Sequence, residues 1–224
     1  SNKKTYGIFL ELTKAYDLAW IEALLFKLSL LGITGSLLLW FKNFLTSRNL
    51  RVRINSTVSS ASPLFVGLPQ GGVLCPTLWT ILILDFPLPS PLIELYLFAD
   101  DIAILLSSHN AGLAQSTLQP YLNQVTTWAD RWRLSFSVDK CAAIAFSKER
   151  TAINPTFFLS NTPIPTTTYF KFLGVYFDSK LTWKFHISHL ATSCIRLANM
   201  LKPLAYRKSG LNSKSLSRLY KVFI

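Results

Sequence analysis

Three carboxylates mark the positions at which this sequence could carry chemistry. Asp100 and Asp101 are adjacent in the stretch L-F-A-D-D, and Glu11 lies far upstream within an apolar stretch. Acidic groups held together in a poorly solvated place repel one another or take up protons unless a cation neutralises them. Oxygen-only ligands suit Mg²⁺ or Mn²⁺, and two such ions can activate a hydroxyl and stabilise a leaving pyrophosphate. The alternative is that the Asp-Asp pair is only a hairpin turn, where Asp is a favoured residue.

The expected secondary structure brings these carboxylates together. Alternation and periodicity predict strands over 6–12, 92–98, 102–106 and 142–146, and helices over 74–84 and 118–132. Helices over 24–31 and 37–45 and a strand over 51–54 are set aside as an insertion, and a Gly/Pro loop covers 67–72. The remaining order is the split βαβ pattern of ferredoxin-like sheets. In such a sheet the first strand lies beside the central hairpin, so we predict that Glu11 approaches Asp100 and Asp101.

Composition and charge narrow the class of protein. Apolar residues make up 50% of the 224 residues and charged ones 15%, which excludes a disordered chain. The longest apolar stretches are interrupted before the roughly 18 residues of a spanning helix, so no membrane association is predicted. Lys and Arg number 23 against 11 Asp and Glu, a net charge of +12. That charge favours a polyanionic partner and a merely basic soluble protein about equally.

The positive charge is concentrated near the end of the chain. From Lys171 onward ten basic residues stand against the single acid Asp178, which accounts for nine of the twelve net charges. Three scattered cysteines favour reduced thiols and an intracellular protein, with nucleus or cytoplasm left open. The only methionine is Met200, so we expect the sequence to be a fragment. The oligomeric state is left open.

Five stretches occur in an order and at a spacing that carry more information together than singly. They are F-L-E-L-T-K-A-Y-D at 9–17, G-L-P-Q-G-G-V-L-C-P at 67–76, L-F-A-D-D at 97–101, W-R-L with D-K-C at 132–141, and F-K-F-L-G-V at 170–175. With this set the chain resembles the reverse transcriptase domain of non-LTR (LINE-type) retrotransposons over almost its whole length.

The resemblance implies an α+β fold in which successive parts of the chain form different polymerase subdomains. It implies a right-hand polymerase palm with a ferredoxin-like βαββαβ core, followed by the start of a helical thumb. The palm would cover residues 1–168, including part of the fingers at 20–66. The primer-grip region and the start of a basic thumb would cover 169–224, where a basic helical face would follow a nucleic-acid backbone.

The resemblance also implies catalytic roles. Glu11, Asp100 and Asp101 would be catalytic and would hold Mg²⁺ (or Mn²⁺), with Asp101 as the less essential partner. Lys140 would meet the triphosphate and protonate the pyrophosphate, although without the motif it is a solvated lysine. Two further groups would contact substrates: the nucleotide-binding residues Tyr16, Gln70 and Gly71, and the primer-grip residues Phe172, Leu173 and Gly174. Their structural alternatives are a core aromatic, a Gly/Pro turn and a core strand closed by glycine.

The implied function is an RNA-directed DNA polymerase that extends a DNA primer 3′-hydroxyl on an RNA template with deoxynucleoside triphosphates. Glu11 stands where the family has an aspartate, and its extra methylene displaces the carboxylate by roughly 1 Å, a misplacement that can cost on the order of 10²-fold in rate. The main alternative is therefore a catalytically inactive nucleic-acid-binding remnant. A plain RNA-recognition fold shares the βαββαβ order but leaves the P-Q-G loop unexplained.

Overall fold

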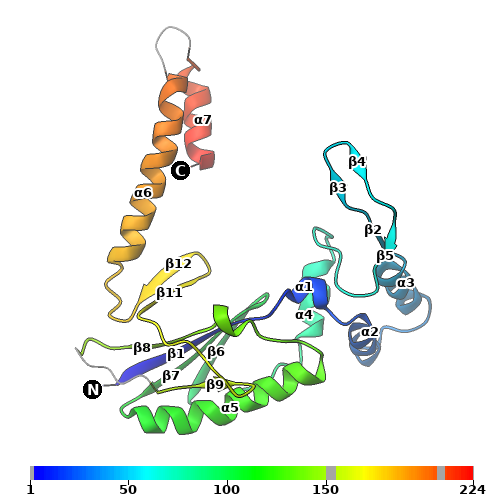
Figure 1. Cartoon of the computed structure of the whole chain (residues 1–224), viewed down its shortest axis with the longest axis horizontal. Helices are drawn as coiled ribbons and strands as arrows, with labels where there is room; N and C mark the ends of the chain where they lie inside the picture. Colours follow the sequence, from blue (N-terminus) through cyan, green and yellow to red (C-terminus); the bar gives the residue numbers. More distant parts are fainter. Residues whose placement is uncertain (1–2, 150–154, 206–209, 224) are drawn as a thin grey trace. The chain divides into compact units, whose positions relative to one another are not determined.

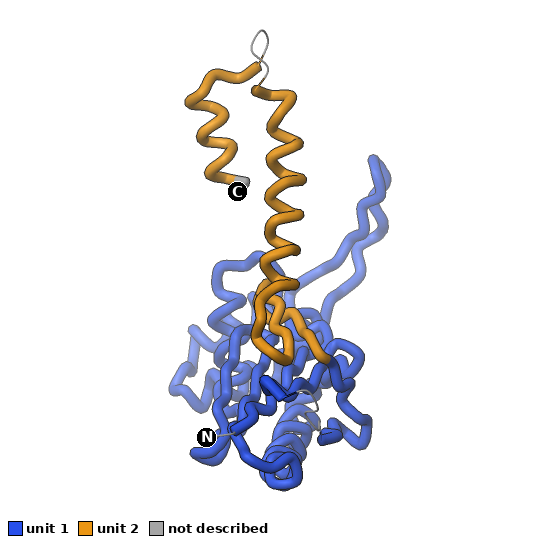
Figure 2. Tube along the Cα trace, turned by 90° about the vertical axis from the view of Figure 1, so that its left-hand side faces the viewer, with its two compact units in different colours: residues 1–167 blue, residues 168–224 orange. Residues whose placement is uncertain are grey.

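The computed structural model describes residues 3–149, 155–205 and 210–223. The chain divides into two compact units, residues 1–167 and 168–224 (Figure 2). Within the described residues, no helix is both long enough and apolar enough to cross a membrane.

A four-stranded antiparallel sheet forms the centre of the first unit (Figure 1). Its strands, in spatial order, are β6 (Ile93–Phe98), β7 (Asp101–Ser108), β1 (Lys4–Glu11) and β8 (Ala142–Phe146). The four strands predicted from apolar patterning are thus present, with ends shifted by one or two residues. The two inner strands are largely buried, as expected where apolar side chains point to both faces.

Helix α5 (Ala111–Arg131) packs against the core of the first unit along one apolar stripe. Its buried residues recur at helical spacing and include Ala114, Leu118, Leu122 and Val125. The helix begins earlier than predicted, where the Asn110 side chain accepts a hydrogen bond from the Gly112 amide at 2.7 Å. Pro120, expected only near a first turn, therefore lies in mid-helix. Burial of the stripe on both sides of Pro120 offsets the backbone hydrogen bond that proline removes.

Four shorter helices lie between β1 and β6. They are α1 (Ala15–Leu18), α2 (Ile21–Leu30), α3 (Gly35–Thr46) and α4 (Cys75–Leu82). Helix α4 is the buried helix predicted over 74–84, and Pro76 lies in its first turn, where the missing N–H costs nothing. Leu24 and Leu28 of α2 are buried with Leu78 and Leu82 of α4, so the two helices share one core.

A narrow hairpin arm extends beyond α3 (Figure 1). The single strand predicted over 51–54 is wrong in extent, because the arm consists of two separate strand pairs. They are β2 (Asn49–Leu50) with β5 (Ser62–Pro63), and β3 (Arg53–Ile54) with β4 (Thr57–Val58). All eight of these residues are exposed, so no burial holds the strands in one continuous ladder.

After α5 the first unit ends in small elements. The 3₁₀ turn η1 (Val138–Lys140) leads into β8, and the hairpin β9 (Phe158–Leu159) with β10 (Thr162–Pro163) follows. Buried Phe157, Leu159 and Ile164 attach this hairpin to the core.

The second unit contains a hairpin and two helices. Strands β11 (Tyr169–Phe172) and β12 (Val175–Asp178) precede α6 (Lys184–Leu201), the 3₁₀ turn η2 (Lys202–Ala205) and α7 (Ser213–Phe223). The Asp178 carboxylate accepts hydrogen bonds from the amides of Lys180, Thr182 and Trp183 just before α6. These bonds hold the pKa of Asp178 below its usual range, although burial acts in the opposite direction.

Candidate active site

The pairing of β1 with β7 sets the position of the candidate carboxylates. Glu11 ends β1 and lies directly opposite Asp101, the first residue of β7. Asp100 occupies the preceding turn, where Ala99 has a φ of 53°. The Asp100 carbonyl accepts a hydrogen bond from the Leu12 amide at 3.4 Å. The structure therefore brings all three acidic residues to one edge of the sheet, as the strand order predicts.

The carboxylates at this edge experience one another's charge. Burial raises the pKa of Asp101, and the negative charges of Asp100 and Glu11 raise it further. A cation placed here would relieve this repulsion. Across residues 3–149, 155–205 and 210–223, no three His, Cys, Asp or Glu side chains are arranged so as to hold a metal ion. The acidic side chains thus interact without forming a complete set of ligands.

Lys140 lies against the first of these carboxylates. Its Nζ forms an ion pair with Oε1 of Glu11 at 2.5 Å, and the Ser137 amide donates a hydrogen bond to the Glu11 carbonyl at 2.9 Å. The hydrogen bond and charge of Glu11 raise the pKa of Lys140, and the charge of Asp100 adds to the effect. The sequence did not predict this pair, because 129 residues separate its members and no local pattern joins them.

Tyr16 lies beside the same carboxylates. Its ring stacks on Trp79 of α4, with ring centres 5.3 Å apart. Burial raises the pKa of the Tyr16 phenol, and the charge of Asp100 raises it further. The ring therefore packs against the core, which was the alternative role considered for Tyr16. It is also close enough to Asp100 to experience its charge.

Gln70 reaches the short helix α1 that follows β1. Its Nε2 donates a hydrogen bond to Oδ1 of Asp17 at 2.6 Å. At Gly67, with a φ of 81°, a Cβ would lie 2.5 Å from the Asp17 carbonyl oxygen, so only glycine fits this approach. Gly71 has a φ of 82°, and a Cβ there would meet nothing within 4 Å. Its backbone conformation, rather than crowding by the chain, accounts for glycine at 71.

Two residues at the site were not singled out from the sequence. Asp17 accepts the hydrogen bond from Gln70, and only its position in the A-Y-D stretch could have indicated it from the sequence. Trp79 donates a hydrogen bond from Nε1 to the Ala99 carbonyl at 2.9 Å, which ties α4 to the turn that carries Asp100. In the sequence, Trp79 was marked only by its position on the apolar face of the predicted helix.

The three candidate primer-grip residues belong to the second unit. Phe172 ends β11 and pairs with Val175 of β12, and Leu173 and Gly174 form the turn between them. Leu173 has a φ of 46° and Gly174 a φ of 83°, so the turn is a tight hairpin.

The mixed helix and sheet fold resembles that of telomerase. The structure is similar to apo telomerase from Candida tropicalis truncated from its C-terminal domain, with a TM-score of 0.55 and 12% identity over 81% of this chain and 35% of that one. It is also similar to Candida tropicalis telomerase in complex with a TWJ fragment of telomeric RNA, with a TM-score of 0.56 and 11% identity over 100% of this chain and 38% of that one.

The sequence identifies the family. The model for "Reverse transcriptase (RNA-dependent DNA polymerase)" matches residues 1–177, and the chain belongs to this family. It is 33% identical to the RNA-directed DNA polymerase from mobile element jockey of Drosophila melanogaster, over 88% of this chain and 22% of that protein. It is 28% identical to the probable RNA-directed DNA polymerase from transposon BS of the same species, over 96% of this chain and 24% of that protein.

The chain thus spans about a quarter of the length of the curated relatives it matches. The predicted resemblance to the reverse transcriptase domain of non-LTR retrotransposons is confirmed. Family membership also accounts for the P-Q-G loop, which a plain RNA-recognition fold leaves unexplained.

Proposed function

We propose that this chain is the palm and the beginning of the thumb of an RNA-directed DNA polymerase, and that Glu11 impairs its catalytic rate. The reaction is nucleotidyl transfer onto the 3′-hydroxyl of a DNA primer, directed by an RNA template. The observation that carries the proposal is the β1–β7 register, which sets Glu11 opposite Asp101 and beside Asp100. The raised pKa of Asp101 supports it, because burial and then the negative charges of Asp100 and Glu11 disfavour the ionised form of this carboxyl.

The strand order supports the palm assignment. In the order β6-β7-β1-β8, the first strand in sequence lies between the third and the fourth, as in the ferredoxin-like βαββαβ arrangement. Helix α4 precedes β6, and helix α5 precedes β8. We assign the palm to residues 1–168, with part of the fingers at 20–66, and the primer grip and thumb to 169–224.

The three carboxylates suit Mg²⁺ or Mn²⁺ by ligand type, although among the described residues they do not form a complete set of ligands. Glu11, Asp100 and Asp101 supply only carboxylate oxygens, the ligands that these hard cations prefer. Bound there, the cations would activate the primer hydroxyl and neutralise the leaving pyrophosphate. Glu11 must first release Lys140, its present partner at 2.5 Å.

The surrounding side chains have complementary tasks. Lys140, once released from Glu11, can hold a proton and a positive charge against the triphosphate. Tyr16, stacked on Trp79, presents a ring on which the sugar of the incoming nucleotide rests. Gln70 is held toward helix α1 by Asp17 and can contact the nucleotide base or the template. The tip of the β11–β12 hairpin, residues 172–174, would hold the primer end.

Primer extension tests the proposal. We compare the natural chain, Glu11→Asp, and Glu11→Asp combined with Asp100→Asn, on an RNA template with Mg²⁺ or Mn²⁺. We expect little activity in the first, a gain on the order of 10²-fold when the carboxylate is retracted by one methylene, and loss in the double variant. Extension by the double variant at the rate of the single variant would contradict the site assignment.

A binding-only remnant is the second candidate function. The ion pair between Lys140 and Glu11 favours it, because a carboxylate satisfied by lysine has less need of a cation. Primer–template binding by all three chains, with no extension by any of them, would support this candidate over the polymerase.

A further inference from the structure

A polar cluster lies where α2, α4 and α5 meet in the first unit. Lys27 of α2 is only 6% exposed, and its Nζ forms an ion pair with Oδ1 of Asp85 at 2.5 Å. The same ammonium group donates a hydrogen bond to the Leu82 carbonyl at the end of α4. A buried lysine is costly unless it is paired and hydrogen-bonded. Lys27 meets both conditions.

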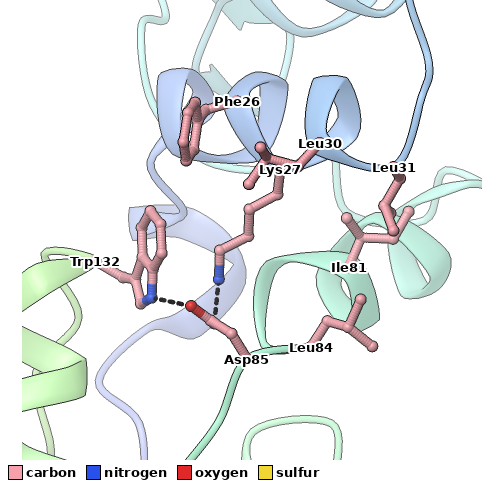
Figure 3. A pocket seen from close by; sticks show the side chains of 8 residues that line it. All are labelled: Phe26, Lys27, Leu30, Leu31, Ile81, Leu84, Asp85 and Trp132. Carbon is pink, nitrogen blue, oxygen red and sulfur yellow. Dashed lines mark hydrogen bonds and ion pairs between the residues drawn. The ribbon is translucent and has the colours of Figure 1, made fainter.

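Two tryptophans at the end of α5 bind the same carboxylate. Trp128 Nε1 donates to Oδ1 of Asp85 and Trp132 Nε1 donates to Oδ2, each at 3.0 Å. Lys27 Nζ also lies 3.8 Å from the centre of the Trp132 ring, a cation–π distance. Figure 3 shows the Lys27 ammonium and the Trp132 indole both directed at the Asp85 carboxylate. We call these four residues the Asp85 cluster.

The cluster borders an apolar cavity of about 170 Å³ (Figure 3). Apart from Lys27, Asp85 and the Trp132 indole, its lining is aliphatic or aromatic: Phe26, Leu30, Leu31, Ile81 and Leu84. The Lys27 side chain is shielded from water, at 7% exposure, whereas the Asp85 side chain is 43% exposed, so the weaker competition from water applies mainly at the lysine. Burial alone would raise the pKa of Asp85, but the hydrogen bonds from Lys27 and the two indoles outweigh it and lower that pKa.

The three helices joined by the cluster adjoin three different candidate site residues. Helix α2 begins five residues after Tyr16, and α4 begins five residues after Gln70. Helix α5 ends at Arg131, and the chain then leads to Lys140. The Asp85 cluster thus joins segments that lead to three separate parts of the candidate site.

The path from α5 to Lys140 is tied to β1 by its backbone. The Thr13 amide donates a hydrogen bond to the Ser135 carbonyl at 2.8 Å, and the Ser137 amide donates to the Glu11 carbonyl at 2.9 Å. Residues 132–140 therefore connect the Asp85 cluster at one end to the Glu11–Lys140 ion pair at the other.

We propose that the Asp85 cluster is a positioning clamp that holds residues 132–140 against β1 and keeps Lys140 beside Glu11. The inference relies on the proposed function only for the task assigned to Lys140. Its geometric content can be measured without catalysis, so a chain that extends no primer still tests it.

Amide hydrogen exchange of the full chain provides the measurement. The reporters are the amides of Ser137 and Lys140, and the reference is the set of amides in the β1–β7 pair. The two indoles donate to different oxygens of Asp85, and in Asp85→Asn one of these oxygens is replaced by an amide NH₂ group, so one indole loses its acceptor. We expect the reporters to exchange roughly tenfold faster while the reference is unchanged. Unchanged reporters, or reporters and reference accelerated equally, would overturn the proposal.

Two further variants separate positioning from simple stabilisation: Lys27→Met, and Lys27→Met combined with Asp85→Asn. Lys27→Met keeps both indole bonds, so we expect it to fold and to accelerate the reporters less than Asp85→Asn does. When Lys27→Met and Asp85→Asn are combined, no unpaired charge is buried, so we expect the melting temperature to recover toward that of the natural chain. The reporters should nevertheless stay fast, because the indoles still lack their carboxylate. Recovery of the reporters together with the melting temperature would show a merely structural role.

Glu149→Gln is the matched control. It breaks the ion pair between Lys4 and Glu149, 2.6 Å long, near the other end of β1. This pair lies outside the path from α5 to Lys140, so the reporters should keep their natural exchange rate. Accelerated reporters in this variant would mean that breaking any ion pair loosens residues 132–140, and the clamp would be refuted.

Discussion

Glu11 lies between a positively charged neighbour and two negatively charged ones. Lys140 holds it as an ion-pair partner, whereas Asp100 and Asp101 make a cation favourable at the same edge of the sheet. Both side chains of the ion pair are partly exposed, at 62% for Lys140 and 33% for Glu11. Exposed pairs of this kind are weak, so a divalent cation can compete with the lysine for the carboxylate.

Lys140→Met should therefore increase the affinity of the acidic edge for Mn²⁺. The variant frees Glu11 and removes a positive charge from the place a cation would occupy. At a subsaturating Mn²⁺ concentration, the rise in melting temperature should be larger than in the natural chain, because ligand binding stabilises the folded state by mass action. Thermal unfolding over a series of Mn²⁺ concentrations measures this rise.

Asp100→Asn, introduced together with Lys140→Met, is the control for this measurement. It removes a proposed ligand and should abolish the additional rise. If the natural chain and both variants respond equally to Mn²⁺, the ion does not bind at these carboxylates.

At the scale of elements, α5 combines a strong apolar stripe with an interior proline. Pro120 is exposed, so its side chain contributes little packing, while its ring removes a backbone hydrogen bond from the helix. Pro120→Ala should consequently stabilise the chain by about 1–3 kcal/mol, the range set by helix propensity and the restored bond. Chemical denaturation measures the gain, with Gln124→Ala, at an exposed position of the same helix, as the control. A decrease in stability would show that α5 needs the proline at this position.

The sequence predicted those strands and helices that are determined by the pattern of neighbouring residues. The four strands and α4 follow from apolar periodicity and proline placement, and the approach of Glu11 to Asp101 follows from strand order. The early start of α5 was missed because Pro120 suggested a first turn, and tertiary burial overrode that preference. The arm beyond α3 was misjudged because its strands have no buried face to mark them.

Contacts between distant residues had no such local signal. Lys27 and Asp85 are 58 residues apart. Lys27 lies in α2 and Asp85 lies just after α4, and the apolar pattern of each helix gives no sign that the two residues pair. The ion pair of Lys140 with Glu11 is likewise invisible in the sequence, since a motif lysine and a solvated lysine look the same there.

At the scale of the whole molecule, the distribution of charge bears on nucleic-acid binding. The chain carries a net charge of +12, and the region from residue 171 onward supplies nine of these charges. Lys184 and Arg196 of α6 are both exposed, and α6 contains no acidic residue. If α6 follows a phosphate backbone, each of these side chains releases counterions when the nucleic acid binds.

Lys184→Gln combined with Arg196→Gln should therefore weaken primer–template binding and make it less sensitive to salt. The slope of log K against log salt concentration should become shallower by roughly 0.7 to 0.9 for each phosphate that the variant no longer neutralises. Fluorescence anisotropy over a series of salt concentrations measures this slope and needs no catalysis. Lys148→Gln, an exposed lysine just after β8 in the first unit, is the control and should leave the slope unchanged. An unchanged slope in the α6 variant would place the polyanion elsewhere on the chain, because neutralising a lysine or arginine that binds phosphate always lowers the number of ions released.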